Sequence, residues 1–146
     1  MGLIIINVDG ALFTSKKQVG ISVVIRDVKG RLLAALCRKI KAPLGLLEVE
    51  AKAYEAGLLL VRHLGLRDGV LEGDSLTIST TLKQFALSPT FVAAVVEGIH
   101  ELGVEIVVVN FSHVHRSGNK LAHILARQAQ NLVNDIIWIE EISCCI

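Results

Sequence analysis

Three apolar segments follow one another closely at the start of the chain, and they constrain the fold more than any other feature. Residues 3–9, 20–27 and 31–39 are rich in Ile, Val and Leu, as buried or half-buried strands are. A polar stretch over 11–19 and the turn sequence Asp-Val-Lys-Gly at 27–30 separate them. Because connections this short join antiparallel neighbours, the segments predict a three-stranded antiparallel sheet.

Helical and strand patterns alternate in the rest of the chain. Apolar residues at spacings of three, four and seven predict a helix over 46–64, which Gly65 ends. Further strands are expected at 69–74 and 104–111, and further helices at 76–87, 89–102 and 119–132, the last capped by Asn119. A helix between the third and fourth strands implies a crossover to a parallel partner. The order βββ-α-β-α-α-β-α therefore predicts an α/β fold with one mixed five-stranded sheet and helices on both faces.

Size and composition limit the possible classes of protein. The chain has 146 residues, of which 52% are hydrophobic, so it has the size of one domain and is not disordered. No apolar run approaches the roughly 18 residues of a membrane helix. The net charge of +1 excludes nucleic-acid binding by overall charge alone. An odd count of three cysteines, without a signal-peptide pattern, predicts an intracellular, reducing compartment, either nucleus or cytoplasm.

The expected domain covers residues 1–133, and residues 134–146 are expected to form a tail that packs on or beside it through Ile136, Ile137 and Trp138. No glycine-rich phosphate loop follows a predicted strand, which argues against a nucleotide cofactor. The oligomeric state stays open.

Acidic residues end two of the predicted strands. Asp9 ends the first strand and Asp74 ends the fourth. Ligands collect at the carboxyl ends of parallel strands, and Glu50 on the first helix can point to the same end. Carboxylates held close together repel, so a cation is expected between them, and oxygen ligands suit Mg²⁺ or Mn²⁺. The simpler alternatives are that Asp9 belongs to a turn, that Asp74 caps a helix, and that Glu48 rather than Glu50 faces the sheet.

Five motifs occur in an order and spacing that resemble the ribonuclease H-like domain, most closely its plant, retroelement-related (reverse-transcriptase-associated) type 1 subgroup. They are NVDGA at 7–11, GISVVIRD at 20–27, EVEA at 48–51, LEGDS at 71–75 and SHVHRSGNKLAH at 112–123. The resemblance covers nearly the whole chain, from about residue 3 to about residue 130.

The resemblance implies an endoribonuclease that uses two metal ions, Mg²⁺ or Mn²⁺, to cut the RNA strand of RNA–DNA hybrids. It assigns catalysis to Asp9, Glu50, Asp74 and His113, and metal binding to the three acids together with His123. The family has a fourth Asp at the position of His123, and a neutral ring supplies no negative charge to a second metal. The alternative is therefore a catalytically impaired module that binds nucleic acid or a protein partner without turnover.

Basic and polar side chains near the motifs are candidate contacts with nucleic acid. The candidates are Lys16, Lys17, Ser75, Arg116, Asn119 and Lys120, with Arg127 as a further phosphate contact. His113 could equally be an ordinary exposed histidine, and His123 a partly buried one. A second set of basic residues forms either a basic track or a solvated sheet edge: Arg26, Arg31, Arg38, Lys39 and Lys41.

Overall fold

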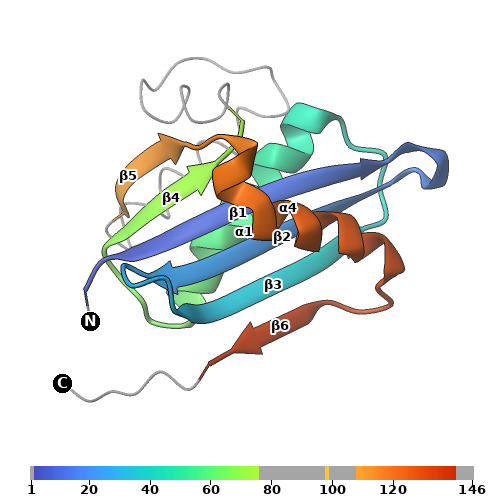
Figure 1. The fold of residues 1–146 in the computed structure, drawn as a ribbon. Coiled ribbons are helices and arrows are strands. Elements are labelled where there is room, and N and C mark those ends of the chain that lie inside the picture. The colour runs from blue at the N-terminus through green and yellow to red at the C-terminus, as the bar shows by residue number, and fades with distance from the viewer. Residues whose placement is uncertain (1, 76–97, 99–107, 141–146) are drawn as a thin grey trace.

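A computed structural model describes residues 2–75, 98 and 108–140 of the chain (Figure 1). One mixed sheet forms its centre, in the strand order β5-β4-β1-β2-β3-β6. The strands are β1 (Ile4–Phe13), β2 (Gln18–Asp27), β3 (Leu32–Ile40), β4 (Gly69–Gly73), β5 (Val108–His113) and β6 (Ile136–Ile139). The helices are α1 (Leu46–His63) and α4 (Lys120–Gln128), with short 3₁₀ turns η1 (Thr14–Lys16), η2 (Arg116–Asn119) and η3 (Ala129–Asn131).

The predicted α/β class and mixed sheet are confirmed. β1, β2 and β3 are antiparallel neighbours, and β1 pairs in parallel with β4, which pairs in parallel with β5. The helix between β3 and β4 therefore makes the expected crossover. The predicted helices at 76–87 and 89–102 lie outside the described residues.

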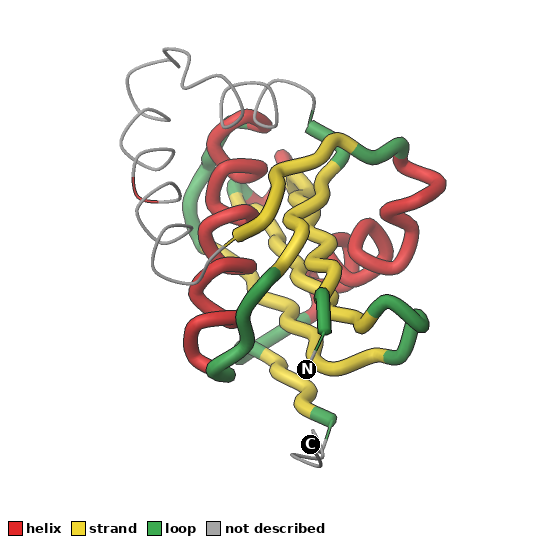
Figure 2. The backbone as a smooth tube through the Cα atoms, turned by 90° about the vertical axis from the view of Figure 1, so that its left-hand side faces the viewer, coloured by secondary structure: helices red, strands yellow, loops and turns green. Residues whose placement is uncertain are grey.

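Helices lie on both sides of the sheet, α1 on one face and the shorter α4 on the other (Figure 2). The larger core lies between α1 and the sheet, where Ile6, Val8 and Val23 meet Val49 and Leu58. A smaller core joins α4 and η3 to the other face through Phe13, Cys37, Ala126 and Ala129. Alternate residues of the same strands serve the two cores, as a sheet covered on both faces requires.

Among the described residues, the sheet has six strands rather than the five expected. The additional strand, β6, lies in the segment expected to be a tail, and it pairs antiparallel with β3. Its side chains are all exposed, so it carries no pattern of burial by which it could be recognised. Among the described residues, no helix has the length and hydropathy to cross a membrane.

β1 and the last helix also differ from their expected bounds, and β5 ends at His113 rather than at residue 111. β1 continues to Phe13, so the turn expected over 11–19 shrinks to η1 and Lys17, which has a left-handed backbone with φ 52°. The last helix is interrupted by 3₁₀ turns at both ends and is α-helical only from Lys120 to Gln128. Asn119 stands at its N-cap, but its side chain makes no capping hydrogen bond. Its Nδ2 atom donates to the Val8 carbonyl of β1, and its Oδ1 atom, which a cap would use, has no hydrogen-bond partner.

Candidate metal centre

Three carboxylates converge where the parallel pairing of β1 with β4 ends. Asp74 follows the last residue of β4, but the expectation that Asp9 ends its strand was wrong, because β1 continues to Phe13. Val8 and Gly73 are register partners in β1 and β4, so the residues that follow them, Asp9 and Asp74, are neighbours. Glu50 reaches the same place from the first turns of α1. Oxygen atoms of the three side chains all lie within 4.8 Å of one another. Asp9 and Glu50 are only 1% and 5% exposed, so the group is a buried cluster rather than a surface acidic patch.

Burial and mutual repulsion disfavour full ionisation of this cluster. Loss of water raises the pKa of Glu50 to about 9, and the charges of Asp9 and Asp74 add to the effect. The pKa of Asp9 is also raised, first by burial and then by Asp74. The Oε2 atom of Glu50 is buried and has no hydrogen-bond partner. A cation would relieve both conditions, because it would neutralise the carboxylates and take up the unpartnered oxygen.

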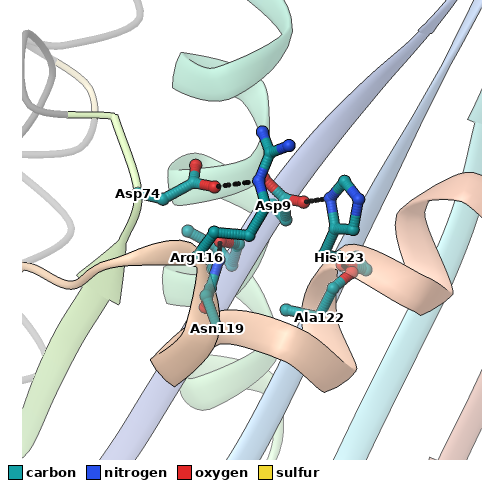
Figure 3. A network of polar contacts seen from close by, with 8 residues as sticks. Asp9, Asp74, Arg116, Asn119, Ala122 and His123 are labelled. Atoms are coloured by element: carbon teal, nitrogen blue, oxygen red, sulfur yellow. Dashed lines mark hydrogen bonds and ion pairs between the residues drawn. The ribbon is translucent and has the colours of Figure 1, made fainter.

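Two side chains from the η2–α4 segment contact the outer oxygens of the cluster. Nδ1 of His123 lies 2.9 Å from Oδ2 of Asp9, and Nε of Arg116 lies 3.4 Å from Oδ2 of Asp74. Figure 3 shows both side chains directed at these carboxylates from the same side. The Arg116–Asp74 ion pair was not foreseen, because Arg116 was expected to contact phosphate. The His123–Asp9 contact brings the histidine beside the acidic cluster.

Close contacts with the sheet hold α4 and its histidine in place. Nδ2 of Asn119 donates a hydrogen bond to the Val8 carbonyl at 2.8 Å, and the Ser22 hydroxyl donates one to the Ala122 carbonyl. Gly20 permits this approach, because a Cβ atom there would collide with the Ala126 carbonyl. Asn119 itself is fully buried. Sequence reasoning missed Ser22 and Gly20 as supports of the site, although a serine and a glycine in an otherwise apolar strand were a visible signal.

The remaining candidate residues lie around the cluster or away from it. His113 ends β5, and its ring packs edge-on against His115, with the ring centroids 5.6 Å apart. Ser75 directly follows Asp74 and is half-buried. Lys16 and Lys17 are exposed in the β1–β2 turn, beyond the end of β1.

Two further basic candidates, Lys120 and Arg127, are exposed on α4. Members of the basic set on β2 and β3 are engaged in surface ion pairs, Arg31 with Asp27 and Arg38 with Asp135.

The donor set is one that suits a hard divalent cation. Asp9, Glu50 and Asp74 supply only carboxylate oxygens, and oxygen ligands are those that Mg²⁺, Mn²⁺ and Ca²⁺ prefer. The one sulfur among the described cysteines, that of Cys37, is buried against α4, where it contacts the Leu125 carbonyl. The three acids therefore fit a metal centre, and His123 is the neighbouring side chain that could add a nitrogen ligand.

Comparison with known proteins finds a matching family and several similar folds. The chain matches the family model of reverse transcriptase-like proteins over residues 7–129. Its fold is similar to RNase H1 of the halophilic archaeon Halobacterium salinarum, with a TM-score of 0.82 and 22% identity over 89% of this chain and 98% of that chain. It is similar to the N-terminal RNase H domain of a Mycobacterium tuberculosis protein, with a TM-score of 0.80 and 19% identity over 90% and 95% of the two chains.

A third similar structure is an RNase H1 from a compost metagenome, solved in complex with an RNA/DNA hybrid. The TM-score is 0.80, with 24% identity over 88% of this chain and 96% of that chain. No curated protein matched the sequence. At these identities the solved structures establish the fold, and the family model covers most of the chain. The chain therefore belongs to the reverse transcriptase-like family and has the RNase H fold.

Proposed function

We propose that this domain is a metal-dependent endoribonuclease that cuts the RNA strand of RNA–DNA hybrids. The observation that carries the proposal is the buried cluster of Asp9, Glu50 and Asp74, whose oxygens lie within 4.8 Å of one another where the parallel pairing of β1 with β4 ends. The finer assignment is to the plant, retroelement-related type 1 subgroup. Support for it comes from the order and spacing of the five motifs, including the histidine in place of the fourth acid.

The proposed roles follow from position and charge. Asp9, Glu50 and Asp74 would hold two Mg²⁺ or Mn²⁺ ions, which when bound activate a water and stabilise the leaving oxygen of a phosphodiester. His113, at the end of β5, would accept a proton from the attacking water or assist product release. Recognition of 2′-hydroxyl groups would select the RNA strand.

The proposed contacts with the nucleic acid lie on α4, in the β1–β2 turn and next to Asp74. Lys120 and Arg127 on α4, and Lys16 and Lys17 in the β1–β2 turn, offer exposed positive charge for phosphates. Ser75 lies close to the centre because it directly follows Asp74 in the sequence. Asn119 would act indirectly, because it is buried and joins η2 to the Val8 carbonyl.

Cleavage of an end-labelled RNA–DNA hybrid tests the proposal. With Mg²⁺ or Mn²⁺, the native chain is expected to cut only the RNA strand, and Asp9→Asn and Asp74→Asn are expected to lose about 100-fold or more in rate, since each removes a charge from the reacting centre. Asp68→Asn is the matched control, because Asp68 is exposed and its left-handed backbone, with φ 59°, tolerates Asn. The control should keep its activity.

The variant His123→Asp belongs in the same assay, because it introduces the fourth acid that the resembling family has at this position. Faster cleavage by this variant is expected if His123 limits the second metal. A folded native chain that binds the hybrid but cuts neither strand with either metal would refute the proposal. The non-catalytic binding module would then remain.

A further inference from the structure

β6 is an outer edge of the sheet with apolar side chains on both of its faces. Ile136, Ile137, Trp138 and Ile139 are between 38% and 53% exposed. Within residues 2–75, 98 and 108–140, β3 is the strand that pairs with β6, and none pairs with its other side. Figure 1 shows β6 at the margin of the molecule, uncovered by either α1 or α4. We call residues 136–139 and their unpaired backbone groups the β6 edge.

The β6 edge lacks the features that usually prevent association of sheets. Natural edge strands are protected by charges, proline, bulges or a covering loop, and the sequence Ile-Ile-Trp-Ile contains no charge and no proline. The strand is nevertheless held firmly in position, because its backbone pairs with β3 over four residues and the Glu140 amide donates to the Leu33 carbonyl at 2.9 Å. It therefore presents an ordered template for another strand.

We propose that the β6 edge pairs with the β6 edge of a second copy of this chain, in antiparallel orientation, and joins the two six-stranded sheets into one. Such a contact is two-fold symmetric and uses the same surface on both copies. The inference does not depend on nuclease activity, since it rests on the far side of the sheet from the acidic cluster.

Side-chain pairing selects one register for this contact. A two-fold axis perpendicular to the sheet keeps the faces of the two copies aligned, so opposed residues come from the same face. With Ile137 at the axis, Trp138 lies opposite Ile136 of the partner subunit, which is a favourable aromatic and β-branched pair. Each register also sets an isoleucine opposite an acid of the partner subunit. With Ile137 at the axis, Ile139 faces Asp135, whose charge Arg38 neutralises. With Trp138 at the axis, Ile136 would face the exposed Glu140, which has no ion pair among the described residues. The Ile137-centred register is therefore the one proposed.

Charge complementarity favours a second copy as the occupant. Asp135 precedes the first residue of β6, and Arg38 neutralises its charge at 2.8 Å. Lys39 and Lys41 follow Arg38 in the sequence, so this end of the strand is basic. The other end carries the exposed Glu140. Antiparallel pairing brings the acidic end of each copy towards the basic end of its partner, at both ends of the contact.

Cysteine cross-linking tests the register directly. Ile137→Cys is introduced into a chain with Cys144→Ser and Cys145→Ser, which leaves the buried Cys37 as the only other thiol. Opposed residues of an antiparallel pair have Cβ atoms about 4.5–5.5 Å apart, close to what a disulfide needs. Mild oxidation should give a covalent dimer with Ile137→Cys and far less with Ile139→Cys. Efficient cross-linking by Trp138→Cys instead would refute the proposed register.

Light scattering after size exclusion tests the dimer itself. The native chain is expected to shift from monomer to dimer as its concentration rises. Ile137→Lys should give a monomer whose circular dichroism spectrum is unchanged, because the side chain is exposed. Val133→Lys is the matched control and should keep the dimer, since Val133 is 88% exposed but lies outside the strand. A native chain that stays monomeric throughout, or a dimer that tolerates Ile137→Lys, would overturn the proposal.

Discussion

At the scale of single residues, the acidic cluster is surrounded by the protein's own donors. Arg116 contacts Asp74 and His123 contacts Asp9, so each of these two carboxylates already has a partner from the η2–α4 segment. Glu50 has a buried oxygen without one. A divalent cation that binds this cluster must therefore compete with the arginine for Asp74, whereas nothing among the described contacts competes for the Oε2 atom of Glu50.

Replacing Arg116 should strengthen metal binding. Arg116→Gln removes a guanidinium that is 69% exposed and pairs with Asp74 at 3.4 Å. Exposed ion pairs contribute about 0.2–1 kcal/mol, so we expect the dissociation constant for Mn²⁺, measured by calorimetric titration, to fall by roughly 1.5- to 5-fold. Lys120→Gln is the control, because it removes the same charge from a neighbouring exposed residue. Equal constants for the two variants would show that Arg116 does not compete with the metal.

At the scale of secondary-structure elements, the position of α4 depends on how closely it approaches β2. Gly20→Ala is expected to destabilise the fold by about 1–3 kcal/mol, the usual cost of overpacking, because the new methyl group would overlap the Ala126 carbonyl and the Ala129 side chain. Urea unfolding measures the loss. Gly2→Ala is the control, since no atom lies within 4 Å of its added Cβ. Equal stability of the two variants would mean that α4 can move away at little cost.

The elements that the sequence predicted well are those with a periodic apolar pattern. β1, β2, β3 and α1 each bury one or two faces, and burial leaves a period of two or of about 3.6 residues in the sequence. β6 leaves no such pattern, because its side chains are exposed and its stability comes from backbone pairing with β3.

The same distinction holds for the candidate site. Asp9 and Asp74 could be placed together because each was expected to end a parallel strand, and the structure puts them beside Glu50, although β1 continues past Asp9 to Phe13. The capping role expected of Asn119 was wrong: its Nδ2 atom donates to the carbonyl of Val8, which is 111 residues away in sequence, and its Oδ1 atom has no partner. Local rules cannot foresee so distant a contact. The Arg116–Asp74 pair likewise forms only when η2 packs beside the end of β4.

At the scale of the whole molecule, the acidic cluster makes folding dependent on pH. The pKa of Glu50 is raised to about 9 in the folded state, from an ordinary value of 4.5, so between these values the folded chain holds a proton that the unfolded chain releases. Its contribution to the free energy of unfolding is therefore fully present below about pH 4.5 and is lost progressively as the pH rises to about 9. The raised pKa of Asp9 acts in the same direction.

Glu50→Gln isolates this effect, because the amide has the shape of the acid and does not ionise. Relative to this variant, the metal-free native chain should lose stability from about pH 5 to about pH 9, by several degrees in melting temperature, since about 1 kcal/mol corresponds to roughly 2–8 °C. Glu48→Gln, on the same helix but outside the cluster, should follow the native curve. Adding Mn²⁺ at high pH should raise the free energy of unfolding of the native chain by RT ln(1 + [L]/Kd), which is about 2.7 kcal/mol at a metal concentration of 100 times Kd. The same addition should stabilise Glu50→Gln less, because one anionic ligand is missing. Parallel pH curves for the native chain and Glu50→Gln would mean that the buried carboxylate is already balanced within the fold, and the argument for a cation at this centre would lose its electrostatic basis.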